Sequence, residues 1–231
     1  MLRGILLDID GTLLLSNDAH AQAWSDALHD FGYDIPWQRI QPLIGMGGDK
    51  LLATLVSGLS TEEGTGKEIA DHRQMIFLQR YLPSLKQAPG SRELVAKLRD
   101  LGMKRVVATS AKGQELEGLL HAAGIADLVE EETTSDDVEH SKSAPDIVHA
   151  ALAKGDLRPE ESLLIGDTPY DVESASKARV GVVAVRCGGH DDEDLSGALA
   201  VYEDPADLLA HLDESPISRQ LTARVDTTGR E

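Results

Sequence analysis

Two aspartates near the N-terminus directly follow a short apolar run. The run Ile5–Leu7 precedes Asp8–Thr12, which reads Asp-Ile-Asp-Gly-Thr. If the run is a buried strand of a parallel sheet, Asp8 and Asp10 emerge at its carboxyl end, where open α/β sheets bind ligands. Carboxylate oxygens at that edge suit Mg²⁺, which prefers hard oxygen ligands. The alternative is an Asx turn without chemistry, in which Gly11 supplies the turn.

A hydroxyl pair and a lysine stand just before further predicted helix starts. Thr109 and Ser110 follow the apolar run Arg105–Ala108, and hydroxyls and amides between a strand and a helix favour anion binding. Lys142 precedes Ser143–Asp146, a capping pattern, and could add positive charge to an anion held at that helix end. The alternatives are an ordinary N-cap at the hydroxyl pair and a solvated loop lysine.

A third acidic strand end follows the apolar run Ser162–Ile165. Gly166–Asp171 reads Gly-Asp-Thr-Pro-Tyr-Asp. A threonine N-cap, a proline at the first helical position and an acidic residue three positions after the threonine form a helix cap. This cap is a structural explanation for Asp171. Asp167 lies before the cap and has no such explanation, so it is the stronger candidate for a metal ligand.

Short apolar runs alternate with helical stretches from about residue 85 to residue 212. Continuous apolar runs favour strands that are buried on both faces of a parallel sheet. The helical stretches stop at or near glycines, as helices commonly do. The alternation predicts right-handed βαβ units and an α/β fold with a Rossmann-like parallel sheet. The expected strands are 5–7, 105–109, 162–165, 181–185 and 199–202, and the expected helices are 91–101, 113–123, 143–154 and 168–179.

Residues 15–83 break this rhythm. The segment shows no convincing strand, and Asp18–Phe31 places its apolar residues at helical spacing. A helical insertion after the first strand is the simplest interpretation, and it leaves residues 1–14 and 84–213 as the α/β core. Residues 214–231 are rich in Ser, Thr, Arg and Glu with few apolar residues, so we expect a mobile tail there.

As a set, these motifs resemble those of the haloacid dehalogenase-like (HAD) phosphohydrolases. The chain has the family's Asp-x-Asp-Gly-Thr, hydroxyl, lysine and Gly-Asp-x-x-x-Asp motifs in the family's order, and the resemblance spans residue 5 to about residue 212. The insertion at 15–83 is similar to the helical C1 cap of the phosphoglycolate phosphatase and β-phosphoglucomutase branch. No single motif is specific, but the ensemble is. The residues that carry it are Asp8, Asp10, Thr109, Lys142, Asp167 and Asp171.

The resemblance implies an aspartyl-phosphate mechanism that depends on Mg²⁺. Asp8 would be the nucleophile, and Asp10 would be the general acid/base that protonates the leaving oxygen and later activates water. Mg²⁺ would bind to Asp8, to the main-chain carbonyl of Asp10 and to Asp167. Asp171 would be a supporting or alternative ligand. The cation is needed because an anionic carboxylate cannot approach an anionic phosphate without positive charge nearby.

The resemblance also assigns residues that bind the phosphoryl group. Thr109 and the Ser110 amide would hold phosphoryl oxygens, and Gly11 belongs to the same phosphate site. Lys142 would offset the negative charge of Asp8 and of the phosphoryl group.

The predicted cap contributes further candidates. His20 lies on the first cap helix and could couple the hinge to the acid/base residue, whereas Trp24 on the same helix fits the core. The loop Gly45–Lys50 resembles the cap loop that faces the active site in this branch. Lys50 could therefore reach a second anionic group of the substrate. The alternatives are a purely structural hinge histidine and a simple glycine turn.

The expected activity is hydrolysis of a small phosphorylated metabolite, such as phosphoglycolate or a sugar phosphate. A β-phosphoglucomutase-like phosphotransferase is the alternative. The mutase motif, however, carries Glu-Asp where this chain has Gly166-Asp167. Asp10 argues against dehalogenation, because haloacid dehalogenases proper lack this aspartate and need no Mg²⁺. Phosphonatases of this family use a cap lysine to form a Schiff base, and Lys50 keeps this activity open as an alternative.

Two further alternatives come from other classes of protein. A non-catalytic receiver-like phosphorylation switch uses similar residues around Mg²⁺, but it needs no insertion after its first strand. The second alternative is a protein-binding scaffold without turnover, and the intact pair Asp8 and Asp10 argues against it.

Composition restricts the partners and the compartment. The chain has 22 basic and 40 acidic residues and a net charge of −18, which repels nucleic acids and anionic membranes. The single cysteine, Cys187, cannot form an internal disulfide and fits a reducing cytosol. The apolar run at the N-terminus is too short for a signal peptide or a membrane span. We therefore expect a cytoplasmic enzyme with a small-molecule substrate, and the oligomeric state is not predicted.

Overall fold

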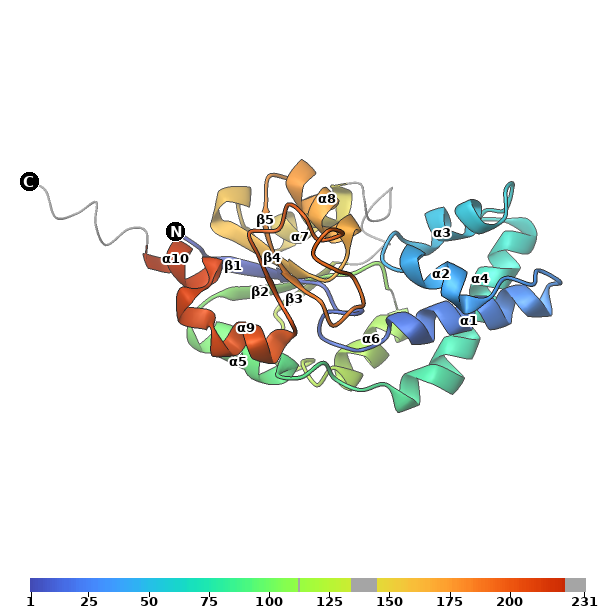
Figure 1. The fold of residues 1–231 in the computed structure, drawn as a ribbon, viewed down its shortest axis with the longest axis horizontal. Coiled ribbons are helices and arrows are strands. Elements are labelled where there is room, and N and C mark those ends of the chain that lie inside the picture. The colour runs from blue at the N-terminus through green and yellow to red at the C-terminus, as the bar shows by residue number, and fades with distance from the viewer. Residues whose placement is uncertain (112, 134–144, 223–231) are drawn as a thin grey trace, which may run out of the picture.

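The computed structural model describes residues 1–111, 113–133 and 145–222. These residues form one six-stranded parallel sheet with the order β3-β2-β1-β4-β5-β6. Figure 1 shows the sheet between helices, with further helices beyond one end of it. The strands are β1 (Gly4–Leu7), β2 (Lys104–Ala108), β3 (Glu131–Thr133), β4 (Ser162–Gly166), β5 (Gly181–Val185) and β6 (Ala200–Tyr202).

The central strands β1 and β4 are buried along their whole length. Because neither face is exposed to water, their sequences are continuous apolar runs rather than alternating ones. β1 pairs in parallel with β2 on one side and β4 on the other, and Leu7 lies opposite Val107 and Ile165. The carboxyl ends of these three strands therefore lie next to one another at one edge of the sheet.

β3 is a strand that the apolar runs did not predict. It lies at the edge of the sheet, where Glu131 and Glu132 are exposed and Thr133 is buried. An edge strand needs no second buried face, and charged residues there discourage pairing with other chains. The apolar signal that identifies the central strands is consequently absent.

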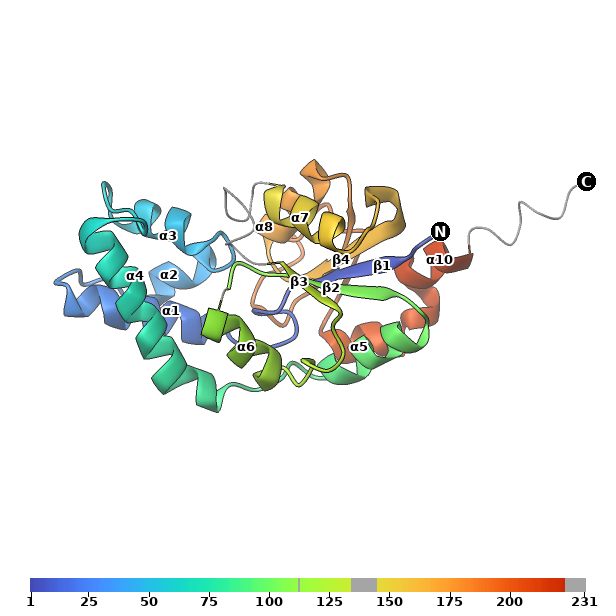
Figure 2. The ribbon, with the colours of Figure 1, turned by 180° about the vertical axis from the view of Figure 1, so that it is seen from behind.

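Helices cover both faces of the sheet (Figures 1 and 2). Ile5 and Leu7 of β1 share a hydrophobic cluster with Leu94 on one face, whereas Leu6 belongs to the cluster of Val148 on the other. This arrangement confirms the predicted Rossmann-like α/β fold. No helix in the described ranges is both long and apolar enough to span a bilayer. The first face carries α5 (Ser91–Asp100), α6 (Gly113–Ala122) and α9 (Pro205–Ala210), and the second carries α7 (Asp146–Lys154) and α8 (Pro169–Lys177).

The segment between β1 and α5 is helical and has its own apolar core. Trp24, Leu28, Leu52 and Ile69 belong to a cluster separate from those of the sheet, which confirms a core position for Trp24. Figures 1 and 2 show these helices beyond the carboxyl edge of the strands. The helices are α1 (Asn17–Asp30), α2 (Trp37–Ile40), α3 (Gly48–Leu55) and α4 (Gly64–Ile76), with short turns at Gln41–Leu43, Phe77–Tyr81 and Leu82–Ser84.

The chain leaves the sheet and returns to it along two adjoining segments. The Leu15 amide donates to the Lys86 carbonyl at 2.9 Å, and the Ala88 amide donates to the Leu13 carbonyl at 3.0 Å. The helical segment is therefore attached beside the carboxyl end of β1. The division into a core of residues 1–14 and 84–213 and a cap of residues 15–83 stays a prediction, and we use these two names below.

The C-terminal region differs from the expected tail. Residues Pro216–Thr222 form the helix α10. Ile217 is fully buried against the core, and Leu221, four residues later, packs against the same cluster. The expectation of a mobile tail from residue 214 is therefore wrong as far as residue 222, because two apolar residues at helical spacing dock an otherwise polar segment. Residues 223–231 lie outside the described part of the chain.

Candidate active site

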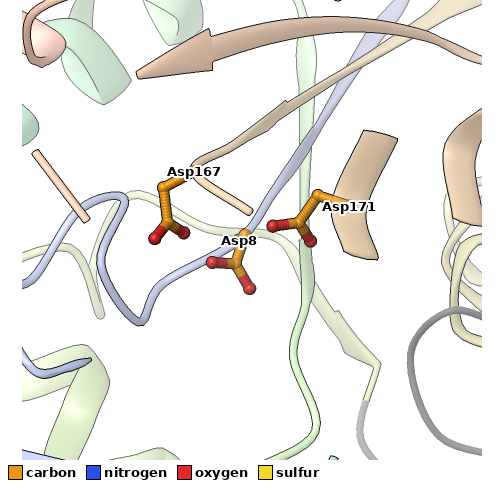
Figure 3. Close-up of side chains that lie close together, drawn as sticks. All are labelled: Asp8, Asp167 and Asp171. Atoms are coloured by element: carbon orange, nitrogen blue, oxygen red, sulfur yellow. The ribbon is translucent and has the colours of Figure 1, made fainter. Parts of the chain in front are cut away.

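Three buried aspartates meet at the carboxyl edge of the sheet (Figure 3). Asp8 follows β1, Asp167 follows β4, and Asp171 lies in the first turn of α8. Each offers a carboxylate oxygen, and these oxygens lie within 4.8 Å of one another. The parallel pairing of β1 with β4 produces this arrangement, because neighbouring parallel strands end at the same edge. The structure thus brings together three of the predicted metal-ligand candidates.

Hydrogen bonds from two residues orient the Asp167 carboxylate. Thr12 Oγ1 lies 2.9 Å from Asp167 Oδ1 and 3.0 Å from Asp8 Oδ2. Asn17 Nδ2 donates to Asp167 Oδ2 at 2.9 Å. The sequence marks Thr12 only as part of the first motif and gives no sign of a role for Asn17. Nothing in the local sequence indicates that either residue contacts an aspartate about 150 positions away.

The charge of the cluster favours a cation. Burial raises the pKa of Asp167 well above its usual value, and the neighbouring carboxylates of Asp8 and Asp171 raise it further. Hydrogen bonds from Asn17 and Thr12 act against this rise. Buried carboxylates of like charge are stable only if they are protonated or paired with positive charge. A donor set of oxygens alone fits Mg²⁺.

Asp171 also caps a helix, as the sequence predicted. Its Oδ2 accepts hydrogen bonds from the Thr168 amide at 3.2 Å and from Thr168 Oγ1 at 2.7 Å. The Asp171 amide in turn donates to Thr168 Oγ1 at 3.1 Å, which completes a capping box at the start of α8. The structural role of Asp171 is thus confirmed, while its role as a metal ligand stays a prediction.

Gly11 is required by the backbone and by the crowded site. Its φ angle is +79°, a region that favours glycine. A Cβ atom at this position would lie 2.1 Å from Asp167 Oδ2. The glycine of the first motif therefore allows the loop after β1 to pass directly beside the aspartate of the fourth motif. Its predicted contact with phosphate stays a prediction.

Asp10 lies at the junction between the core and the cap. Its Oδ1 accepts a hydrogen bond from Ser16 Oγ at 2.6 Å and lies 2.8 Å from His20 Nε2. On the other side of the imidazole, Arg73 Nη2 contacts His20 Nδ1. Arginine has no acceptor, so Nδ1 must accept this hydrogen bond and the ring proton must be on Nε2. His20 Nε2 therefore donates to Asp10 Oδ1.

A buried ion pair extends this chain of contacts from the cap to the core. Arg73 of α4 donates to both carboxylate oxygens of Glu115 in α6, at 3.0 and 2.9 Å. The Arg73 and Glu115 side chains are 14% and 7% exposed. The His20 ring also stacks on Phe77 with 4.0 Å between ring centroids. The structure thus shows a contact between His20 and Asp10, and Arg73 and Glu115 extend it towards the core. The acid/base role of Asp10 and the coupling role of His20 stay predictions.

We expect Glu115→Gln to destabilise the protein by about 3 kcal/mol, because removal of one partner leaves the other charge buried and unpaired. Urea unfolding followed by circular dichroism measures this free energy. The control is Asp71→Asn, which removes the exposed pair between Lys67 and Asp71 on the same helix α4. That exposed pair should contribute less than about 1 kcal/mol. Equal losses in the two variants would contradict the structural importance of the junction.

Two of the predicted phosphate-binding residues, Thr109 and Ser110, lie at the same edge of the sheet. Thr109 follows β2, which pairs directly with β1, and its side chain is buried. Its Oγ1 accepts a hydrogen bond from the Ala111 amide at 3.2 Å. Ser110 is half-buried. Lys142 lies outside the described residues, so its predicted contact with the phosphoryl group stays a prediction.

The cap loop contacts the core next to the aspartate cluster. A Cβ atom at Gly45 would lie 2.8 Å from Thr168 Cγ2, and Tyr170 Oη donates to the Pro42 carbonyl at 3.3 Å. The loop therefore lies over the start of α8. Lys50 follows in the first turn of α3, with a half-buried side chain. Its predicted contact with a substrate anion stays a prediction.

Comparisons with known proteins agree with this fold. The family model of haloacid dehalogenase-like hydrolases matches residues 5–185. The chain belongs to this family.

Individual relatives support the predicted enzyme class. The phosphoglycolate phosphatase of Rhodospirillum rubrum is 27% identical over 216 residues, which cover 90% of each chain. The chloroplastic protein SUPPRESSOR OF QUENCHING 1 of Arabidopsis thaliana is 29% identical over 186 residues, which cover 79% of this chain and 18% of that longer protein. A solved hydrolase from Pseudomonas syringae has a TM-score of 0.84 and 31% identity, and the match covers 92% of this chain and 98% of that chain. The prediction of a HAD-like phosphatase is thereby confirmed.

Proposed function

We propose that this HAD-like phosphatase hydrolyses a small phosphorylated metabolite through an aspartyl-phosphate on Asp8 and requires Mg²⁺. The observation that carries the proposal is the buried cluster of Asp8, Asp167 and Asp171, whose carboxylate oxygens lie within 4.8 Å of one another. Such a cluster has little use in a protein that does not bind a cation, because burial of like charges is unfavourable. The cytoplasm is the proposed location, since a single half-buried thiol, Cys187, suits a reducing compartment.

Asp8 and Asp167 would hold Mg²⁺ together with the main-chain carbonyl of Asp10. Asp171 would support the site from the first turn of α8 or act as an additional ligand. When bound, Mg²⁺ would reduce the repulsion between the Asp8 carboxylate and the phosphoryl group. Thr109 and Ser110 would contact the phosphoryl oxygens from the side of β2. The proposed role of Lys142 is to offset the negative charge of Asp8 and of the phosphoryl group.

The chemistry proceeds in two displacements at phosphorus. An oxygen of Asp8 forms a bond to phosphorus while the bond to the leaving oxygen breaks, and Asp10 donates a proton to that oxygen. Asp10 then takes a proton from a water molecule whose oxygen attacks the aspartyl-phosphate. This second step releases inorganic phosphate and restores Asp8. The hydrogen bonds from Ser16 and His20 both act on Asp10 Oδ1, which favours Oδ2 as the oxygen that carries the proton.

Phosphoglycolate or a sugar phosphate is the proposed type of substrate, in line with the Rhodospirillum rubrum relative. A mutase fits this chain less well. A Cβ atom at Gly166 would lie 2.8 Å from both Cβ and Cγ of Asp171. A glutamate at position 166, as in the mutase motif, would therefore displace Asp171. The Gly166-Asp167 pair of this chain favours hydrolysis over phosphoryl transfer between sugar positions.

A panel of phosphorylated metabolites and an aryl phosphate, assayed for released phosphate with Mg²⁺ and with EDTA, tests the proposal. We expect repeated turnover with Mg²⁺ and none with EDTA. An isomerised sugar phosphate without phosphate release would instead identify a mutase. At most one phosphate for each protein molecule would identify a phosphorylation switch, and no reaction at all would identify a scaffold.

Lys50 provides a test of substrate selection by the cap. If Lys50 contacts a second anion of the substrate, Lys50→Ala should lower kcat/KM for a carboxylated substrate. The loss should correspond to about 1–3 kcal/mol of transition-state free energy, the range of a charge-assisted hydrogen bond. Hydrolysis of an aryl phosphate with an uncharged ring should change little. Lys67→Ala, which removes an exposed cap lysine on α4, is the control. Equal losses of Lys50→Ala on both substrates would assign Lys50 to the cap structure rather than to selection.

A further inference from the structure

A buried asparagine joins the start of the cap to the aspartate cluster. Asn17 is the first residue of α1 and is 6% exposed. Its Nδ2 donates to Asp167 Oδ2 at 2.9 Å and to the carbonyl oxygen of Gly188 at 2.8 Å. Both hydrogens of one amide group are used, one on the carboxylate and one on the loop after β5. Asn17 thereby connects the first cap helix, the end of β4 and the end of β5.

Two glycines make the room for this contact. A Cβ atom at Gly11 would lie 2.2 Å from Asn17 Nδ2, and a Cβ atom at Gly188 would lie 1.7 Å from Asp167 Oδ2. The loops after β1 and β5 can therefore approach the amide and the carboxylate only as glycine backbone. The reversed amide would place Asn17 Oδ1 against two acceptors, so the observed orientation is the one the surroundings require.

The other end of the amide indicates that Asn17 serves as a donor. Asn17 Oδ1 is buried and has no hydrogen-bond partner among the described residues. An unsatisfied buried carbonyl disfavours folding. Alanine at this position would avoid that cost and suits a helix. An asparagine kept for the fold alone is therefore a poor choice, and its donor contact with Asp167 accounts for it.

We propose that Asn17 is a positioning residue for the Mg²⁺ ligand Asp167. Thr12 contacts Oδ1 of this carboxylate and Asn17 donates to Oδ2, so hydrogen bonds hold both of its oxygens. Each carboxylate oxygen has a second lone pair, which remains for a cation. The Gly188 carbonyl anchors the amide in turn. This inference rests on the metal site of the proposed function, and it assigns a residue of the cap to that site.

Binding of Mn²⁺ to the metal-free and substrate-free protein tests the inference. Mn²⁺ takes the same oxygen ligands as Mg²⁺, and the free ion can be counted by its EPR signal. Asn17→Ala should weaken the Mn²⁺ affinity by about tenfold or more, the effect of removing a hydrogen-bond partner from a metal ligand. Asn17→Ser has a single hydroxyl hydrogen for two acceptors and should fall between the wild type and Asn17→Ala. The serine variant decides the matter if the alanine variant does not fold.

Ser25→Ala is the matched control. Ser25 lies on the same helix and donates through Oγ to the Ile35 carbonyl at 2.7 Å, inside the cap. Its loss removes a hydrogen bond of similar kind, and the Mn²⁺ affinity should equal that of the wild type. The activity deficit of Asn17→Ala should also shrink as Mg²⁺ approaches saturation, which a general structural defect would not show.

The outcomes separate the inference from the proposed function. Weaker Mn²⁺ binding in the Asn17 variants with unchanged binding in Ser25→Ala supports the positioning role. Wild-type affinity in both Asn17 variants overturns that role and leaves the metal site intact. A wild-type protein that binds no Mn²⁺ overturns the metal site itself, and the role of Asn17 with it.

Discussion

Asp8→Asn is expected to lower kcat by about 10⁴-fold or more, the scale of effect seen when a catalytic nucleophile is removed. The amide has nearly the shape of the carboxylate but is a poor nucleophile, so the aspartyl-phosphate cannot form. The buried position of Asp8 and the hydrogen bond from Thr12 Oγ1 to Oδ2 at 3.0 Å are compatible with an amide oxygen at the same place. The fold should therefore remain, and circular dichroism together with phosphate release measures both properties.

The same substitution should not lower the thermal stability of the metal-free protein. Because the Asp8 carboxylate is one of the charges that raise the pKa of Asp167, its removal relieves repulsion in the metal-free protein. Metal-free Asp8→Asn should therefore unfold at a temperature equal to or above that of the metal-free wild type. A folded variant that retains near-wild-type turnover would refute the assignment of Asp8 as the nucleophile.

Replacement of Asp167 should have the second largest effect. Asp167→Ala removes a proposed Mg²⁺ ligand, and with it one of the two acceptors of Thr12 and one of the two acceptors of Asn17. We expect the Mg²⁺ concentration that gives half-maximal activity to rise by about 100-fold or more, since the loss of a ligand exceeds the loss of its hydrogen-bond partner. Asp167→Asn, which keeps the shape of the side chain, is the companion variant and should also be impaired.

Ca²⁺ should inhibit the wild-type enzyme. Ca²⁺ binds up to eight oxygens and would engage both oxygens of Asp8, whereas Mg²⁺ binds six oxygens and would leave one oxygen of Asp8 to attack phosphorus. Rates measured with Mg²⁺ and increasing Ca²⁺ test this expectation. Full activity in EDTA, or equal rates with the two ions, would exclude the metal site as proposed.

The fold could be predicted because its core consists of local signals. Strands buried on both faces need apolar residues at every position, so β1, β4 and β5 appear as continuous runs such as Ile5–Leu7. Parallel pairing then fixes where Asp8, Thr109 and Asp167 lie, because each follows a strand of the same sheet. The edge strand Glu131–Thr133 lacked this signal and was missed.

The contacts that complete the site could not be predicted in the same way. Asn17 reaches Asp167 across 150 positions, and Arg73 reaches Glu115 across 42. Each residue looks like an ordinary polar position of a helix, since only tertiary packing decides which side chain faces it. The same reason explains the C-terminal helix, where Ile217 docks on the core although its neighbours are polar.

The most direct test of the account is the location of the phosphoryl group during turnover. Asp10→Asn should still transfer phosphate from an aryl phosphate whose leaving group needs no proton, but it lacks the base that activates water. Rapid acid quenching, digestion and mass spectrometry of this variant with Mg²⁺ should therefore find the phosphoryl group on the peptide that contains Asp8, and none in the presence of EDTA. A phosphoryl group on another residue, or none on the protein while phosphate is released, would contradict the account.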